Sequence, residues 1–262
     1  MNKLGFIGLG NMGRAIASGL IAGGAIAPEN VYGYAPHWDK LSAYAAEAGI
    51  HACRSAAEVV ENVDTVLMAV KPYVIEGALK EIRDALKGKA VISVALGYDY
   101  ARMRPLLDES TRIQFIMPNT PALVGAGVLL FEQANSLTPE ERADLMAKFA
   151  ALGAVEELPS HLMGIGGAVS GCGPAFCAMV IEALADAGVK YGLPRATAYR
   201  LASQMVAGTG RMQIETGQHP GAIKDGVCSP GGTTIRGVEA LERAGLRAAM
   251  LDAVQAVMEK EV

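Results

Sequence analysis

The sequence has few of the features that mark nucleic-acid-binding, membrane or disulfide-stabilised proteins. Its 262 residues include four cysteines and 5% aromatic residues, and the formal net charge is -4. A low aromatic content weakens any proposal of base stacking. A negative charge disfavours nucleic acid and anionic membranes, because both select a basic face. No run approaches about 18 uninterrupted apolar residues, so no transmembrane helix is predicted. We expect neither nucleic acid nor membrane as a partner.

The cysteines show neither the spacing of a metal site nor the density of a disulfide scaffold. No metal is therefore predicted, and Cys53, Cys177 and Cys228 are interpreted as small apolar fillers. Cys172 stands between two glycines and is the cysteine to consider for a pocket. The first residues reach glycine too early for a signal peptide, so we expect a cytoplasmic protein.

What the sequence does contain is a glycine pattern near its beginning. Residues 3–7 are an apolar run typical of a buried strand, and Gly8, Gly10 and Gly13 follow in the spacing Gly-x-Gly-x-x-Gly. Apolar residues then recur at helical spacing. In a strand–turn–helix context this spacing indicates dinucleotide binding. Gly8 would make the tight turn, Gly10 would admit a pyrophosphate, and Gly13 would let helix and strand pack closely.

The residues after a second predicted strand, at 30–34, bear on the choice of cofactor. An NAD site usually ends this strand with Asp or Glu, which binds the ribose 2′-hydroxyl. Here the first acid, Asp39, comes late, and His37 and Lys40 are placed where they would neutralise a 2′-phosphate. The predicted cofactor is therefore NADP, with NADPH preferred and NADH left open. The alternative is that His37 and Lys40 are solvated residues at the start of a helix.

Strand and helix patterns continue to alternate as far as residue 159. Repeated βα units with buried apolar strands predict a parallel, doubly wound sheet. Ligands in such sheets lie beyond the carboxyl ends of the strands. Lys71 and Asn119 lie at two of these ends, and for each of them a purely structural role is the alternative to ligand contact. The residues predicted to bind the cofactor are Ile7, Gly8, Leu9, Gly10, Asn11, Met12, Ala35, His37, Ala69, Val70, Lys71, Pro72 and Ala95.

Beyond residue 160 the alternation stops and the pattern is helical. Helices predicted over 175–191 and 195–216 are apolar around more than one stripe, which implies that a partner subunit covers the excess. The predicted fold class is α/β. A Rossmann-like, doubly wound, mostly parallel sheet (1–159) precedes an all-helical domain for dimerisation and substrate binding (160–262).

A second glycine-rich segment, Ser-Pro-Gly-Gly-Thr-Thr at residues 229–234, precedes an apolar helical pattern. Unpaired N–H groups and the dipole at a helix start favour an anion, and paired glycines let backbone amides approach a small ligand. The segment predicts a pocket for a carboxylate or phosphate, with Thr233 and Thr234 as hydrogen-bonding side chains. An ordinary turn with a threonine N-cap is the alternative.

These segments together resemble the pyrroline-5-carboxylate reductase family over essentially the whole chain. The most specific matches are Ala-Val-Lys-Pro at 69–72, Met-Pro-Asn-Thr-Pro at 117–121, Ser-Gly-Cys-Gly-Pro-Ala at 170–175, the segment 186–194, and 219–221 with 229–234. The resemblance implies NAD(P)H-dependent reduction of the cyclic imine 1-pyrroline-5-carboxylate to L-proline, the last step of proline synthesis. It also implies a homodimer through the helical domain, with a decamer left open.

The resemblance assigns roles within the second glycine-rich segment. The backbone from Gly231 to Thr233 would hold the substrate carboxylate, and Thr234 would be the catalytic group, hydrogen-bonded to the ring nitrogen. The substrate-binding residues implied are Ser229, Gly231, Gly232, Thr233 and Thr234. Two positions depart from the family pattern. Cys172 replaces a usual serine, and Ala35 stands where some members place a polar residue for the 2′-phosphate.

Three rival interpretations fit parts of the sequence. The β-hydroxyacid dehydrogenases share the first glycine pattern but rely on a lysine one helical turn after a glycine-rich segment, whereas the first lysine after Gly173 is Lys190. A non-catalytic NADP-binding regulatory protein would have no reason to retain residues 229–234. A reductase of a related cyclic imine stays open, because pocket size cannot be read from a sequence.

Overall fold

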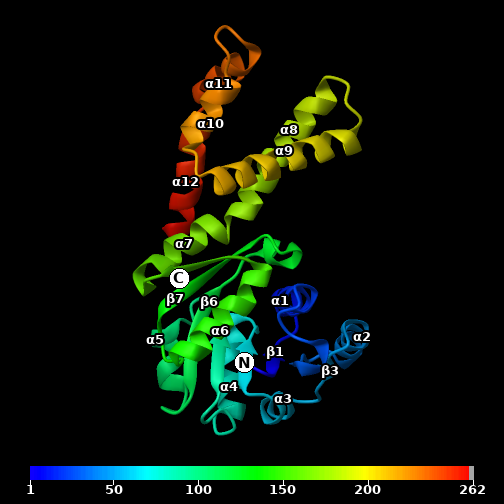
Figure 1. Ribbon diagram of the computed structural model, residues 1–262, viewed down its shortest axis with the longest axis vertical. Coiled ribbons are helices and arrows are strands. Elements are labelled where there is room, and N and C mark those ends of the chain that lie inside the picture. Colours follow the sequence, from blue (N-terminus) through cyan, green and yellow to red (C-terminus); the bar gives the residue numbers. More distant parts are fainter. Residues whose placement is uncertain (260–262) are drawn as a thin grey trace. The chain divides into compact units, whose positions relative to one another are not determined.

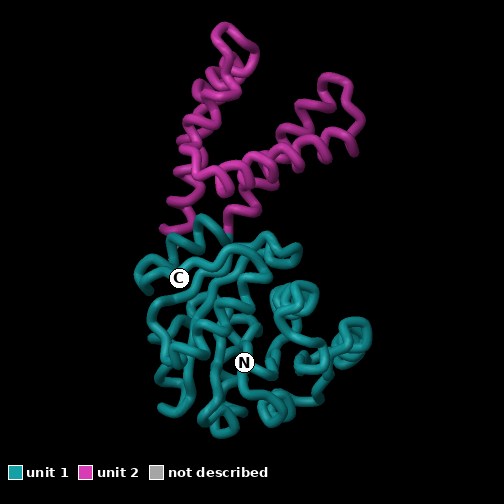
Figure 2. The backbone as a smooth tube through the Cα atoms, viewed as in Figure 1, with its two compact units in different colours: residues 1–171 teal, residues 172–262 magenta. Residues whose placement is uncertain are grey.

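The computed structural model describes residues 1–259. The chain divides into two compact units, one ending at Gly171 and the other beginning at Cys172 (Figure 2). The domain boundary predicted between residues 159 and 160 stays a prediction. Helix α7 (Met163–Ser170) lies in the first unit, where a Cβ at Gly167 would be only 2.2 Å from the sulfur of Met117. The glycines that disfavour a helix in isolation thus let α7 approach the sheet closely.

In the described residues the first unit contains an eight-stranded sheet of order β3-β2-β1-β4-β5-β6-β7-β8 (Figure 1). The strands are β1 (Leu4–Ile7), β2 (Val31–Tyr34), β3 (His51–Ala52), β4 (Thr65–Met68), β5 (Ala90–Ser93), β6 (Arg112–Met117), β7 (Gly127–Asn135) and β8 (Gly153–Leu158). β1 to β6 are parallel, β7 is antiparallel to β6, and β8 is parallel to β7. The predicted mostly parallel, Rossmann-like class is confirmed. The structure also contains a short strand, β3, and its strand β7 is antiparallel; neither feature was part of the prediction.

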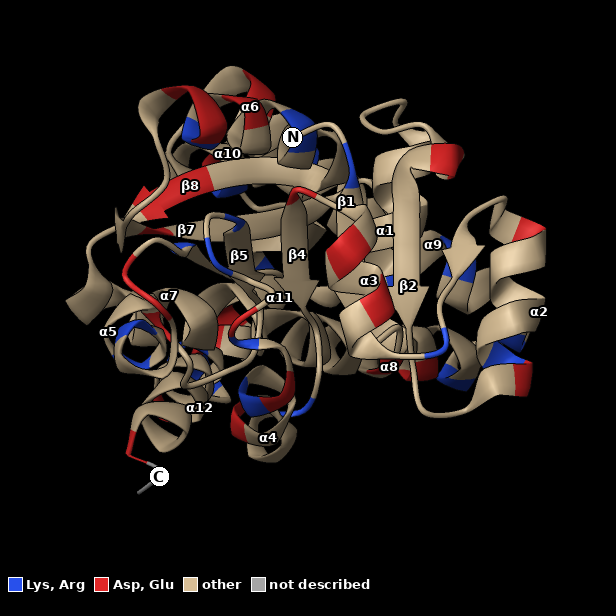
Figure 3. Cartoon of the chain, turned by 90° about the horizontal axis from the view of Figure 1, so that it is seen from below, with Lys and Arg blue, Asp and Glu red and all other residues tan. Residues whose placement is uncertain are grey.

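Helices cover both faces of this sheet, as a doubly wound fold requires. One face packs against α1 (Asn11–Ala22), α2 (Trp38–Ala48) and α6 (Pro139–Phe149), and the other against α3 (Ala56–Asn62), α4 (Pro72–Ile82) and α5 (Tyr100–Met103). Short 3₁₀ turns lie at Pro28–Asn30, Arg104–Leu106, Thr120–Val124, Ala150–Leu152 and Ser160–Leu162. Figure 3 shows Lys, Arg, Asp and Glu on the helices and loops, whereas β1, β2, β4 and β5 carry none. These uncharged strands fit burial between two helical layers.

The second unit is a set of helices that bury few of their own side chains. They are α8 (Gly173–Lys190), α9 (Arg195–Thr216), α10 (Pro220–Val227), α11 (Thr233–Arg243) and α12 (Leu246–Met258). α8 packs against α9, and buried Ala185 and Ala198 show that small residues allow the close approach. Large apolar side chains stay exposed in the single chain, including Met179, Leu201, Ile214 and Leu251. This exposure agrees with the prediction that a partner covers these helices.

The helical stretch Ser160–Lys190 is long and apolar enough to cross a membrane, by length and composition alone. Glycines, Ser170, Pro174, Glu182 and Asp186 interrupt its apolar residues, so it contains no uninterrupted apolar run of about 18 residues. A helix that a partner subunit covers has the same composition, and most of this stretch is exposed in the single chain. The expectation of no membrane partner stays a prediction.

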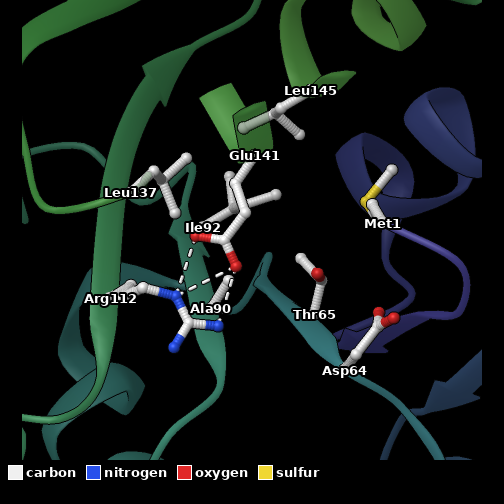
Figure 4. A pocket seen from close by; sticks show the side chains of 9 residues that line it. All are labelled: Met1, Asp64, Thr65, Ala90, Ile92, Arg112, Leu137, Glu141 and Leu145. Atoms are coloured by element: carbon white, nitrogen blue, oxygen red, sulfur yellow. Dashed lines mark hydrogen bonds and ion pairs between the residues drawn. The ribbon is translucent and has the colours of Figure 1, made fainter. Parts of the chain in front are cut away.

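An ion pair joins α6 to the amino ends of the strands. Arg112 donates through Nε to both carboxylate oxygens of Glu141, at 3.0 and 2.8 Å, beside a hollow of about 80 Å³ (Figure 4). Glu141 also accepts from the backbone N–H of Thr138, which completes a capping box at this helix start. Burial alone would raise the pKa of Glu141, but the hydrogen bonds from Arg112 and Thr138 outweigh it, so the pKa is lowered.

We expect Glu141→Gln to destabilise the chain by about 1 kcal/mol near neutral pH and by less in acid. A carboxylate with a lowered pKa stabilises the fold above the unfolded-state value of 4.5 and loses this effect as the pH falls. Urea unfolding of wild type and variant at several pH values between about 3 and 7 measures the difference. Glu140→Gln, on the same helix, is the control. A difference that stays constant across this range would contradict the account.

Candidate functional site

The first glycine pattern forms a tight turn between β1 and α1. Gly8 has φ +99°, and its N–H donates to the carbonyl of Tyr34 at 2.9 Å. A Cβ at Gly8 would lie 2.8 Å from the backbone of Ala69, and one at Gly13 would lie 2.5 Å from the Gly8 carbonyl oxygen. Both positions therefore need glycine for the protein's own packing.

Gly10 differs from these two glycines. It has φ −80° and ψ −162°, which other residues adopt readily, and a Cβ there would meet nothing within 4 Å. Gly10 is the N-cap of α1, no side chain caps the helix, and its first turn carries no acid. The open space therefore lies in front of unpaired helix N–H groups, where an anion is favoured.

This space belongs to a cleft of about 1160 Å³ along the carboxyl ends of β1, β2, β4 and β5. Of the predicted cofactor-binding residues only Ile7 is outside its lining, because Ile7 is buried in the core. The predicted residues that line it are Gly8, Leu9, Gly10, Asn11, Met12, Ala35, His37, Ala69, Val70, Lys71, Pro72 and Ala95. Sequence reasoning missed Arg14, Ala15, Pro36, Tyr73, Val74, Val94 and Leu123, which complete it together with Lys40, Leu96 and Thr120.

The end of the cleft next to β2 is cationic. His37 and Lys40 line it, as does Arg14 from α1. Arg14 donates from Nε to the carbonyl of Leu9 at 3.1 Å and from a terminal nitrogen to the carbonyl of Lys40 at 3.0 Å. No acidic residue lines the cleft within the part of the chain that the structure describes. The available signal for Arg14 was its place directly after the third glycine of the motif.

The other end of the cleft is mostly apolar and borders β4, β5 and the turn after β6. Lys71 is the N-cap of α4 and lines the cleft there. Asn119 is outside the lining, since its side-chain amide donates to the carbonyl of Ser170 and its oxygen accepts from the N–H of Val128, both at 2.9 Å. Asn119 therefore has a structural role: its two hydrogen bonds hold the end of α7 against the sheet.

In the second unit, residues 229–232 form a tight turn before α11. Gly231 has φ +70°, and the N–H of Gly232 donates to the carbonyl of Ser229 at 3.0 Å, as in a type II turn with proline and glycine at its centre. α11 begins at Thr233, with Gly232 as N-cap, no capping side chain and no acid in the first turn. Thr233 and Thr234 are exposed. This turn and helix start contain the predicted substrate-binding residues, and their role in holding a carboxylate stays a prediction.

The described residues hold no group of three or more His, Cys, Asp or Glu arranged for a metal ion. Burial, with the charge of Glu58, raises the pKa of Cys53 to about 11, so this thiol is neutral, as a core filler would be. Cys172 is a half-buried residue at the start of α8. The chemistry that these units support is the binding of a dinucleotide and of a small anion.

Comparisons with known proteins agree with this geometry. The family described as "Pyrroline-5-carboxylate reductase dimerisation" matches residues 160–262, and "NADP oxidoreductase coenzyme F420-dependent" matches residues 3–97. The pyrroline-5-carboxylate reductase of Escherichia coli (strain K12) is 45% identical over 259 residues, 98% of this chain and 96% of that protein.

Solved structures give the same result. The pyrroline-5-carboxylate reductase of Coxiella burnetii has a TM-score of 0.89 at 33% identity, covering 98% of this chain and 96% of that one. The Plasmodium falciparum pyrroline carboxylate reductase, solved with NADP bound, has a TM-score of 0.87 at 32% identity, covering 98% and 95%. With identities of this size over nearly the full length, the chain belongs to the pyrroline-5-carboxylate reductase family.

Proposed function

We propose that the chain catalyses the NADPH-dependent reduction of 1-pyrroline-5-carboxylate to L-proline. The observation that carries the proposal is that one chain of this family holds both parts such a reaction needs. These are a dinucleotide cleft with open space at Gly10 and an uncapped helix start at Thr233. Both fit the names of the relatives, including the Plasmodium falciparum protein solved with NADP.

The cleft residues fit NADP in three respects. The uncapped start of α1 would bind the pyrophosphate, since Gly10 leaves room for it. An NAD site carries an acid at the end of β2, which would repel a 2′-phosphate, but here Ala35 follows β2. His37 and Lys40 line the same end of the cleft and would neutralise the 2′-phosphate. Ala95, with Lys71 and Pro72, would border the nicotinamide half, because the dinucleotide crosses the crevice from β2 towards β5.

The turn before α11 fits the substrate. The N–H groups from Gly231 to Thr233 would hold the carboxylate, and neutral backbone donors suit a small anion that must also leave as product. Thr234, one residue further into the helix, would hydrogen-bond the ring nitrogen. A protonated imine is already electrophilic, so orientation against the cofactor is the main requirement on the protein. Bound NADPH would supply the hydride.

The test is the absorbance of NADPH with purified protein, before and after 1-pyrroline-5-carboxylate is added. We expect oxidation that depends on the imine, and a lower kcat/KM with NADH. A six-membered cyclic imine carboxylate, added in parallel, tests the alternative substrate. Faster turnover of that compound would reassign the substrate. Cofactor binding without oxidation of either imine would contradict a reductase.

We further propose that a second copy of the chain covers the apolar surface of residues 172–258. Support comes from the exposed side chains of α8, α9 and α12 and from the dimerisation family that matches this region. We expect light scattering to give a particle of at least two chains, with a decamer as the larger assembly. A well-folded monomer at micromolar concentration would contradict this proposal.

A further inference from the structure

Arg14 occupies a position in the cleft that the family's glycine motif does not explain. It is half-buried and lines the cationic end of the cleft beside His37 and Lys40. Its guanidinium lies 4.8 Å from the centre of the Tyr44 ring, within range of a cation–π contact. With its bonds to the Leu9 and Lys40 carbonyls, at 3.1 and 3.0 Å, the group has three points of attachment.

These attachments join the two segments that would enclose the adenosine ribose. Leu9 belongs to the glycine turn after β1, and Lys40 to the first turn of α2. Arg14 bridges them and so fixes the backbone from which the Lys40 side chain projects. The long Lys40 side chain is exposed. A preorganised backbone would lower the entropy lost when its ammonium group binds an anion.

The charge of Arg14 is not neutralised within the protein. None of the ion pairs among residues 1–259 involves Arg14. A guanidinium has five N–H donors, and the described bonds to Leu9 and Lys40 use two of them. Arginine also stays protonated at any physiological pH. An anion between Leu9 and Lys40 would thus meet a fixed charge with donors to spare.

We infer that Arg14 is a specificity-determining residue for the 2′-phosphate of NADPH, acting with Lys40. The inference rests on the proposed function, because it concerns the cofactor of that reaction. Residue 35 is alanine, so the end of β2 offers no polar side chain to this phosphate. Arg14, reaching across from α1, takes that role.

Calorimetric titration with adenosine fragments tests this without any turnover. The ligands are adenosine 2′,5′-bisphosphate and 5′-AMP, which differ only in the 2′-phosphate. For Arg14→Met we expect the affinity for the bisphosphate to fall by about 30-fold and that for 5′-AMP by less than about threefold. The ratio of kcat/KM for NADPH to that for NADH should fall by a similar factor. Arg14→Lys keeps the charge but loses the planar guanidinium, so its affinity for the bisphosphate should lie between those of wild type and Arg14→Met.

Arg54→Met is the matched control, since it removes an equal charge near the same segment. Arg54 lies over the ring of Trp38, 3.3 Å from its centre, and outside the cleft lining. We expect it to leave the bisphosphate affinity within about twofold. An equal loss for both fragments in Arg14→Met would reduce Arg14 to a structural bridge and overturn the inference. So would an equal effect of Arg54→Met, or no effect of either.

The fragment titration also separates this inference from the proposed function. If wild type fails to reduce the imine but Arg14→Met still loses bisphosphate affinity selectively, the reductase proposal fails and the cofactor inference stands. In case Arg14→Met does not fold, Arg14→Lys supplies the second variant, and Lys40→Met is combined with whichever of the two folds. Because the two residues are proposed to act together, the double variant should lose less than the product of the single losses.

Discussion

Gly10→Val is expected to abolish cofactor binding and leave the fold intact. A Cβ at Gly10 meets no protein atom within 4 Å, and its backbone angles suit an L-residue. The valine would instead fill the space in front of the α1 start, where the pyrophosphate would lie. We expect the Kd for NADPH to rise at least about 100-fold, which corresponds to about 2.7 kcal/mol of binding free energy. Unfolding free energy should change by about 1 kcal/mol or less.

Two further glycine variants make this measurement specific. Gly77→Val, on an exposed turn of α4 that also has no atom within 4 Å, should leave NADPH binding unchanged. Gly13→Ala should instead unfold the first unit more easily, because its Cβ would lie 2.5 Å from the Gly8 carbonyl. Calorimetry with NADPH and thermal unfolding, run on all three variants, separate the two effects. NADPH binding by Gly10→Val at wild-type strength would contradict the assignment of the cleft.

Thr234→Val is expected to lower kcat/KM for the imine by about 100-fold. Valine keeps the shape of threonine and removes the hydroxyl proposed to bond the ring nitrogen. The loss corresponds to about 2.7 kcal/mol of transition-state binding, the scale found when one directed hydrogen-bonding group is removed. Thr234→Ser retains a hydroxyl and should stay within about fivefold. Steady-state kinetics at saturating NADPH measure all of these values.

Thr233→Val is the matched control for this variant. Thr233 is proposed to act through its backbone N–H, which valine retains at the same position of α11. Its kcat/KM should therefore stay within about fivefold of wild type. Thr234→Val within about twofold of wild type, or a loss shared equally by both variants, would remove Thr234 from the reaction.

The alternation of strands and helices and the glycine turn could be predicted because their causes are local. Gly8 has a positive φ, and the Gly8 carbonyl leaves no room for a Cβ at Gly13. Both positions therefore require glycine, and the two glycines appear in the sequence at a fixed spacing. The capping box at Thr138 and Glu141 is equally local, because both residues lie within four positions at the start of α6. The turn before α11 follows from Pro230 and Gly231 in the same way.

Features that depend on contacts between distant segments could not be predicted. The position of the Arg14 side chain depends on the carbonyls of Leu9 and Lys40, which accept its hydrogen bonds and come together only in the fold. α7 is a helix although its glycines disfavour one. A glycine is needed at position 167 because Met117 lies against it in the fold. Asn119 could not be assigned until its partners Ser170 and Val128 were known. In each case the deciding atom belongs to a part of the chain that no local pattern identifies.

The reaction proposed for this chain is hydride transfer from NADPH to the imine carbon of 1-pyrroline-5-carboxylate. The most direct measurement uses NADPH carrying deuterium at nicotinamide C4, with the amino-acid product analysed by mass spectrometry and chiral chromatography. We expect L-proline with a single deuterium on the carbon that was the imine carbon, from one of the two C4 epimers. Unlabelled proline from both epimers, or oxidation of NADPH without proline, would contradict it.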